Sequence, residues 1–150
     1  MTREYLQEIK KILDDGGVLV ANTFSTSELY DHESVTYREV FGPFFNFKMP
    51  ITGNRVIIAR ENGLPADNVI VRRARELASD LAPYDVDIKK YPRYMSRDID
   101  WDTDKRALTD QYSPANLLRG YLLNHFVVGF AVQDDLVVTQ TSGLPPVAVL

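Results

Sequence analysis

The segment from residue 13 to residue 24 constrains the fold more than any other part of the chain. Its sequence is Leu-Asp-Asp-Gly-Gly-Val-Leu-Val-Ala-Asn-Thr-Phe. Gly16 and Gly17 can supply the left-handed turn that commonly ends a helix. The apolar run that follows, residues 18–21, is typical of a parallel strand covered on both faces. The segment therefore predicts a helix-to-strand step inside an α/β sheet.

Polar side chains follow this predicted strand at its carboxyl end. They belong to Asn22, Thr23 and Ser25. Because open α/β sheets bind ligands outside the carboxyl ends of their strands, these residues are candidates for lining a substrate cleft. Alternatively, Thr23 and Ser25 only begin the next helix, as such residues often do.

Two helices are predicted on either side of this strand. Residues 4–13 place their apolar side chains on one helical face. After the strand, Ser25-x-x-Glu28 matches a capping box, which would open a second helix. Gly42 and Pro43 would end that helix.

Two more strands are predicted after the second helix, at residues 44–49 and 55–60. Between them, residues 50–54 read Pro-Ile-Thr-Gly-Asn, which is the composition of a hairpin turn. The two strands should therefore be antiparallel neighbours. Thr52 and Asn54 lie in the turn, and a plain turn explains its Gly and Asn without any function.

The second half of the chain is less regular. Residues 66–81 have a helical period, residues 84–88 alternate like a short strand, and residues 91–105 should be irregular. A turn-like stretch is expected at 108–114, followed by a final helix up to residue 126. Residues 127–132 and 136–139 should form a hairpin. The apolar ending, 143–150, has no assigned role.

Composition excludes several classes of protein. With 150 residues, 45% of them apolar, the chain can bury one ordinary core. A net charge of −4 gives no reason to expect nucleic-acid binding. The absence of cysteine excludes disulfides, thiol nucleophiles and thiolate metal sites. A charged start and the lack of any run near ~18 apolar residues predict a cytoplasmic protein without a membrane partner.

Five segments, taken in order, resemble a known family. They are Gly-Gly-Val-Leu-Val-Ala-Asn-Thr-Phe-Ser at 16–25, Ser-Glu-Leu-Tyr at 27–30, Thr-Tyr-Arg-Glu-Val-Phe-Gly at 36–42, Asn-Arg-Val-Ile-Ile-Ala at 54–59, and Leu-Thr-Asp-Gln-Tyr-Ser-Pro-Ala-Asn-Leu-Leu at 108–118. Together they resemble the C-terminal half of spermidine synthase-like proteins. These are polyamine aminopropyltransferases built on the class I S-adenosylmethionine-dependent methyltransferase fold.

The resemblance implies a fold. In the family, the fifth, seventh and sixth strands lie in that order at one end of the sheet. Residues 18–24 would be the fifth strand, residues 44–49 the sixth, and residues 55–60 the antiparallel seventh. We therefore expect an α/β fold with a partial Rossmann-like methyltransferase sheet and flanking helices over residues 1–120. Residues 121–150 would hold the end of a helix and an unassigned tail.

The resemblance also implies an activity, the transfer of an aminopropyl group from decarboxylated S-adenosylmethionine to an amine. Asn22, Thr23 and Ser25 would border the amine, and the turn with Thr52 and Asn54 resembles a loop that helps to close the polyamine pocket. The family's glycine-rich donor loop, its ribose-binding acidic residue and its catalytic aspartate have no counterpart in the sequence, so no catalytic residue is assigned. Decarboxylated S-adenosylmethionine or S-adenosylmethionine would bind only if another chain supplied the missing half.

Other candidate residues have simpler explanations. Tyr30, Tyr37 and the Phe44-Phe45-x-Phe47 group could form a wall for an aliphatic amine, but their spacing favours core positions. His32 and His125 lack metal-ligand spacing, so no metal site is expected. The alternating acids Asp98, Asp100, Asp102 and Asp104 around Trp101 could attract a polyamine or a divalent metal, although an exposed acidic loop is favoured.

A different function is also open. The chain could be a non-catalytic remnant of the methyltransferase fold that acts as an interaction or assembly module. A half-sheet would leave one edge of strand 18–24 unpaired, and an exposed apolar edge promotes association. We therefore expect a homo-oligomer or a complex with a chain that supplies the N-terminal half, rather than a monomer with a closed parallel sheet.

Overall fold

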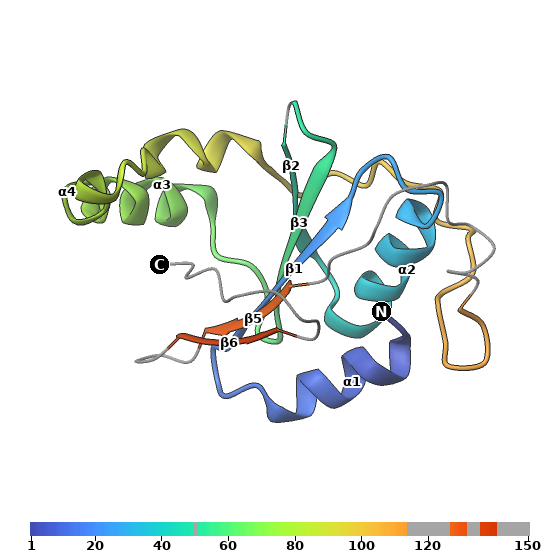
Figure 1. Ribbon diagram of the computed structural model, residues 1–150. Helices are drawn as coiled ribbons and strands as arrows, with labels where there is room; N and C mark the ends of the chain where they lie inside the picture. The colour runs from blue at the N-terminus through green and yellow to red at the C-terminus, as the bar shows by residue number, and fades with distance from the viewer. Residues whose placement is uncertain (50, 114–126, 132–135, 141–150) are drawn as a thin grey trace.

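The computed structural model of the chain describes residues 1–49, 51–113, 127–131 and 136–140 (Figure 1). It is a mixed α/β fold with one sheet in the order β4-β2-β3-β1-β5-β6. The elements are α1 (Arg3–Ile12), β1 (Val18–Phe24), α2 (Tyr30–Phe41), β2 (Phe44–Lys48), β3 (Asn54–Arg60), α3 (Asp67–Glu76), α4 (Ala78–Leu81), β4 (Met95–Ser96), β5 (Val127–Ala131) and β6 (Leu136–Gln140). In Figure 1, α1 and α2 lie on one side of β1 and β3, and α3 and α4 lie on the other.

The predicted hairpin of β2 and β3 is confirmed. These strands pair antiparallel from Phe44 opposite Ala59 to Lys48 opposite Arg55. Gly53 has a φ of 67°, a left-handed conformation that glycine adopts without strain, so it suits the tight connection between the strands. β3 also pairs along the whole length of β1, and it therefore lies between β1 and β2.

The antiparallel pairing of β1 with β3 is the one that the resemblance implies for the fifth and seventh strands. Two other expectations about β1 are wrong. The apolar run predicted a parallel strand, but the second neighbour of β1, β5, is antiparallel as well. The edge expected to be unpaired carries β5 along Val18–Ala21. Burial alternates along β1, with the side chains of Leu19, Ala21 and Thr23 buried and those between them half-buried. An apolar run therefore shows that a strand is covered, but it does not determine the direction of the neighbouring strand.

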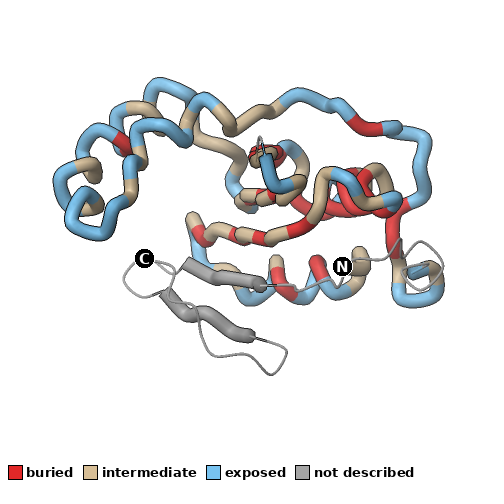
Figure 2. Tube along the Cα trace, turned by 45° about the horizontal axis from the view of Figure 1, so that its top comes forward, coloured by how far each residue is buried: buried red, intermediate tan, exposed pale blue. Residues whose placement is uncertain are grey.

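The core lies between the sheet and the two helices α1 and α2. Leu6 and Ile9 of α1 are buried, as their spacing predicts. Lys10 Nζ donates a hydrogen bond of 2.9 Å to the carbonyl oxygen of Val40, which joins α1 to the end of α2. The buried cluster comprises Leu6, Ile9, Leu19, Ala21, Tyr30, Tyr37, Val40, Phe41, Phe44, Ile57, Ala59 and Trp101. In Figure 2 the buried residues, in red, gather in the sheet and in α1 and α2, whereas α3 and α4 are largely exposed, in pale blue.

The predicted capping box of α2 is wrong, whereas its predicted end is confirmed. α2 begins at Tyr30, and no side chain caps it. Ser25 instead donates its hydroxyl to the carbonyl oxygen of Gly53 at 3.0 Å, because the chain between β1 and α2 passes beside the β2–β3 turn. At the other end, Gly42 has a φ of 74°, and its N–H bonds to Arg38 O at 2.9 Å.

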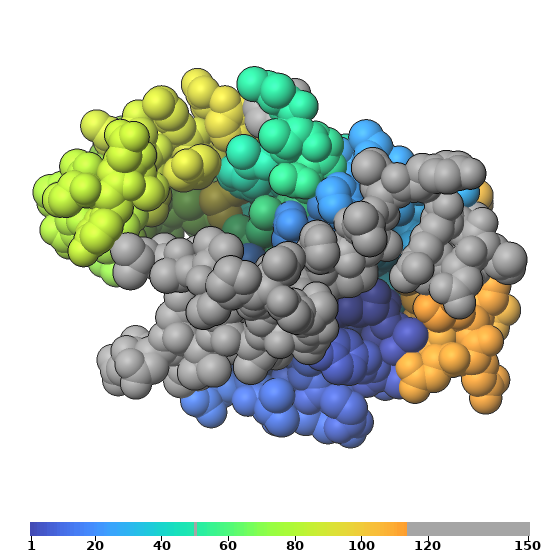
Figure 3. All heavy atoms as spheres, viewed as in Figure 1, coloured from blue at the N-terminus to red at the C-terminus, as the bar shows by residue number. Residues whose placement is uncertain are grey.

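Residues 66–96 form a segment that we call the arm. The helix expected at 66–81 is divided at Leu77 into α3 and α4. The short strand expected at 84–88 is wrong, since 3₁₀ turns occupy Ala82–Tyr84 and Ile88–Lys90 instead. Pro83 contributes to this outcome because proline favours the first turn of a helix and has no N–H for a sheet. Figure 3 shows the arm, in yellow-green, as a lobe beside the strands.

The remaining predictions fall near the end of the chain. The turn at 108–114 is confirmed by a bridge between Thr109 and Tyr112. The hairpin is confirmed by the antiparallel pairing of β5 and β6. The predicted final helix and the apolar ending lie outside the described residues. Among the helices that the structure describes, none has the length and apolar character needed to cross a membrane.

Candidate functional site

Three of the five predicted site residues, Ser25, Thr52 and Asn54, lie close together at one end of the sheet. Phe24 at the end of β1 pairs with Asn54 at the start of β3, which brings the two flanking loops together. Ser25 donates its N–H and its hydroxyl to Gly53 O, at 2.8 and 3.0 Å. The Asn54 N–H donates to the Thr52 hydroxyl at 3.3 Å. These contacts show that the loop of residues 25–29 and residues 51–53 of the β2–β3 turn meet at one edge.

Asn22 and Thr23, however, point to opposite faces of the sheet. Thr23 is 2% exposed and lies opposite the buried Arg55 on β3. Asn22 is half-buried and lies opposite Val56 on the other face. Successive side chains of a strand alternate between faces, so neighbours in sequence cannot both line one cleft from the same face.

Arg55 is a functional candidate that sequence reasoning missed. Its side chain is fully buried on the α2 face of β3, where burial lowers its pKa. Its Nε donates to Asn46 Oδ1 at 2.9 Å, its Nη2 to Ser34 Oγ at 2.7 Å, and its Nη1 to Tyr30 O at 3.5 Å. The guanidinium also lies 4.2 Å from the centre of the Tyr30 ring. In the sequence, Arg55 is only a basic residue at the start of a predicted strand, and nothing near it indicates that its side chain is buried.

Asp100 is the carboxylate that completes this network. Its Oδ1 accepts hydrogen bonds from Tyr30 Oη at 2.5 Å and from Asn46 Nδ2 at 3.1 Å, while its Oδ2 pairs with Lys48 Nζ. Partial burial raises the pKa of Asp100, but the hydrogen bonds from Lys48 and Tyr30 outweigh that effect and hold the pKa below its usual value. Asp100 is exposed, as expected of an acidic loop, but its hydrogen-bond partners were not predicted.

The other acids of that loop agree with the expectation of an exposed surface. Asp98, Asp102 and Asp104 are exposed, whereas Trp101 is buried and stacks on Phe44 with ring centres 5.1 Å apart. Within the described ranges, no group of three His, Asp or Glu side chains could hold a metal ion.

Two buried oxygens lie beneath the carboxyl end of β1. Glu33 of α2 is 4% exposed, and burial raises its pKa against the opposing positive charges of Met1 and Arg55. Within the described part of the chain, Glu33 Oε2 and Thr23 Oγ1 make no hydrogen bond of good geometry, although contact with the Thr23 hydroxyl opposes the rise in the pKa of Glu33. Buried polar atoms usually make such a bond, so this position is unusual within the core.

The remaining candidates lie in the core or on the surface. Tyr37, Phe44, Phe45 and Phe47 are buried, which confirms that they are core residues. His32 is held by a contact of 2.7 Å between its Nδ1 and the carbonyl oxygen of Arg106. His125 lies outside the described residues.

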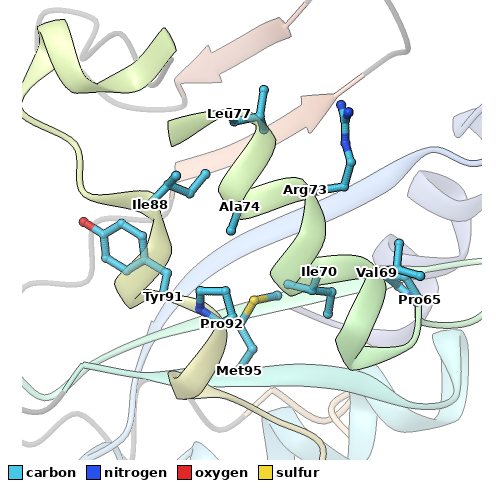
Figure 4. Close-up of a pocket in the computed structure, with 10 residues that line it drawn as sticks. All are labelled: Pro65, Val69, Ile70, Arg73, Ala74, Leu77, Ile88, Tyr91, Pro92 and Met95. Atoms are coloured by element: carbon cyan, nitrogen blue, oxygen red, sulfur yellow. The ribbon is translucent and has the colours of Figure 1, made fainter. Parts of the chain in front are cut away.

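A separate apolar groove lies on the arm (Figure 4). It has a volume of about 350 Å³, and it opens between α3 and the 3₁₀ turns that follow. Its lining residues are Pro65, Val69, Ile70, Arg73, Ala74, Leu77, Ile88, Tyr91, Pro92 and Met95. None of the predicted site residues borders this groove.

Comparison with known proteins finds a similarity to a polyamine aminopropyltransferase. The chain is 56% identical over 120 residues to a polyamine aminopropyltransferase of Vibrio vulnificus (strain CMCP6). The match includes 79% of this chain and 40% of the relative, so the chain spans about two fifths of that protein. No family model matches the chain. No solved structure matches it either. The match supports the resemblance found in the sequence: over 120 residues this chain is similar to part of a polyamine aminopropyltransferase.

Proposed function

We propose that this chain is the C-terminal part of a spermidine synthase-like polyamine aminopropyltransferase and that it contributes the amine side of the active site. The observation that carries this proposal is the 56% identity over 120 residues to the Vibrio vulnificus protein. Because the chain spans 40% of that relative, the donor-binding residues and the catalytic base belong, in this proposal, to residues outside these 150. A cytoplasmic location is part of the same proposal.

The order of the strands supports the proposal. β1, β3 and β2 are neighbours in that order, and β3 is antiparallel to both of the others. The resemblance implies this arrangement for the fifth, seventh and sixth strands of a methyltransferase-type sheet. On this basis the carboxyl end of β1 faces the substrate cleft, which is the usual ligand-binding edge of such a sheet.

The chemistry of the polar edge suits an amine. In aminopropyl transfer, an amine nitrogen attacks the carbon next to the sulfonium of decarboxylated S-adenosylmethionine. A C–N bond forms, the C–S bond breaks with its electron pair passing to sulfur, and the nitrogen gives a proton to a base. Hydroxyl and amide oxygens of Ser25, Thr52 and Asn54 can accept hydrogen bonds from the ammonium groups of a polyamine. They can orient the nucleophile, which is a substantial part of catalysis of such a step.

One observation favours the alternative of a non-catalytic assembly module. β5 pairs with β1 along Val18–Ala21, the edge at which the donor-binding half would add its own strand. A chain that keeps this pairing could not accept that half by strand addition. Association through another surface, with a second copy or a different partner, would then be its function.

Reconstitution separates these two functions. The 150-residue chain is mixed with the amino-terminal part of the Vibrio vulnificus relative, ending where the match begins, and release of methylthioadenosine is measured with putrescine as the amine. We expect activity from the mixture and from neither part alone, with the full-length relative as the positive control. A stable complex that releases no methylthioadenosine would refute the enzymatic proposal and support the assembly module.

A further inference from the structure

The two loops at the polar edge begin or end in the same hydrogen-bond network, which is buried around Arg55 and exposed at the side chains of Lys48 and Asp100. The loop of residues 25–29 leads into Tyr30, the first residue of α2. The turn of residues 49–53 starts directly after Lys48, and β3 continues through Arg55, which pairs with Lys48 across the hairpin. Tyr30 and Lys48 both bond to Asp100, and Arg55 bonds to Tyr30, so the three residues belong to one network.

Arg55 holds the start of α2 against the sheet. Its Nη2 donates to Ser34 Oγ at 2.7 Å, and its Nη1 donates to the carbonyl oxygen of Tyr30 at 3.5 Å. Its Nε donates to Asn46 of β2 at 2.9 Å. One fully buried side chain thereby joins the helix that follows the loop to both strands of the hairpin.

Asp100 closes the network from a distant part of the chain. It accepts hydrogen bonds from the Tyr30 hydroxyl, the Asn46 amide and the Lys48 ammonium group. Tyr30 and Lys48 flank different loops, so a single carboxylate holds the end of one loop and the start of the other. Charged hydrogen bonds are the stronger ones, and a connected network fixes geometry more firmly than isolated pairs do.

We propose that Arg55 and Asp100 are positioning residues that set the distance between Ser25 and the turn with Thr52 and Asn54, and thereby shape the amine site. The choice of ligand rests on the proposed function. The anchoring of the two loops does not, because it follows from the contacts alone.

Amide exchange in the full 150-residue chain tests the anchoring. Asp100→Ala removes the shared acceptor. Asp98→Ala is a matched control in the same loop, because among the described side chains Asp98 accepts a hydrogen bond from Ser96 alone. The Ser25 and Met49 amides bond to Gly53 O and Asn54 O and report on the two loops. We expect them to exchange about tenfold faster in Asp100→Ala than in Asp98→Ala, while amides in the middle of β1 and β3 change less than about twofold.

Equal exchange of Ser25 and Met49 in the two variants would overturn the proposal. A uniform increase across the sheet would also overturn it, because it would show a purely stabilising role. If Asp100→Ala does not fold, Asp100→Asn keeps one acceptor oxygen and permits the same comparison. Lys48→Arg preserves the charge and should leave the exchange of both loops close to that of the unmodified chain.

Titration with putrescine, followed through the Ser25 and Thr52 amide signals, tests the link to the amine site. We expect Asp100→Ala to weaken putrescine binding about threefold to tenfold, equivalent to about 0.7 to 1.4 kcal/mol, and Asp98→Ala to leave it unchanged. No binding to the unmodified chain would count against the proposed amine site, whereas the exchange experiment would still decide the anchoring. Binding unchanged in Asp100→Ala would overturn the positioning role.

Discussion

The sheet with α1 and α2 differs sharply from the arm in how it buries its apolar residues. Both regions contain helices with apolar side chains at helical spacing. In α1, Leu6 and Ile9 are 0% and 3% exposed, because α2 and the sheet cover them. In residues 66–96, all of which the structure describes, Ala74 is the single buried residue. Amphipathic spacing therefore predicts a helix, but burial depends on a second layer.

The polar groups differ in the same way. In the sheet region, Arg55 and Glu33 are buried and belong to one cluster with Tyr30 and Ser34. On the arm, the ion pairs of Glu76 with Arg72 and Arg73 are exposed. Buried charges are costly to leave unpaired, whereas exposed pairs contribute little to stability. The two regions should therefore respond very differently to equivalent substitutions.

The largest expected effect is that of Arg55→Met. The substitution removes the donors for Asn46 and Ser34 inside the core, so it should lower the free energy of unfolding by about 3–5 kcal/mol. Arg73→Met on the arm is the matched control and should change it by less than about 0.5 kcal/mol. Urea unfolding followed by circular dichroism measures both. Equal losses would contradict the contrast between the two regions.

The next largest expected effect on stability comes from a Leu→Ala substitution, which removes the same apolar volume whether it is made in the sheet region or on the arm. Leu19→Ala truncates a side chain that is 0% exposed and should cost about 3 kcal/mol in the free energy of unfolding. Leu77→Ala truncates a half-buried side chain of the groove and should cost about 1 kcal/mol or less. Thermal and urea unfolding test the pair. A larger loss for Leu77→Ala would show that the arm is covered in solution.

The pH dependence of stability sharpens the comparison at Glu33. Burial raises the pKa of Glu33 above its ordinary value of 4.5, so the folded chain binds a proton more tightly than the unfolded chain. Protonated Glu33 therefore contributes to the free energy of unfolding. This contribution is complete below pH 4.5 and is lost as the pH rises through the raised pKa. Glu33→Gln should therefore flatten this decline, measured as urea unfolding between pH 4.5 and 7. The exposed control Asp80→Asn should keep the decline, and an unchanged profile in Glu33→Gln would contradict the assignment.

The smallest expected effect is that of Glu76→Gln. It weakens both exposed ion pairs of the arm, yet the free energy of unfolding should change by only about 0.3 kcal/mol because solvent screens such pairs. The difference should shrink further in 1 M salt. Urea unfolding at low and high salt measures it. A loss above about 1 kcal/mol would show that the arm depends on these charges.

Local signals predicted much of the fold. The stripe of Leu6 and Ile9, the end of α2 at Gly42 and the turn around Gly53 follow from side-chain spacing and glycine conformation. These features depend on residues within a few positions of each other. The capping box failed because Ser25 bonds to Gly53, a partner 28 residues away.

The candidate site was predicted in part for a related reason. The carboxyl end of β1 and the β2–β3 turn carry recognisable polar residues, and the structure brings Ser25, Thr52 and Asn54 together. Arg55 and Asp100 were missed because their roles come from distant partners. Asp100 lies 70 residues from Tyr30, and an arginine or an aspartate at these positions does not by itself indicate a hydrogen-bond network.

The sequence by itself determined the secondary-structure units with strong local chemistry, the hairpin, and the likeness to spermidine synthase-like proteins. These properties depend on the order and spacing of residues along the chain. Only the tertiary structure decided the pairing of β5 with β1, the opposite faces of Asn22 and Thr23, and the network around Arg55. Strand pairing and buried hydrogen bonds join residues far apart in sequence, so their partners become defined only when the chain folds.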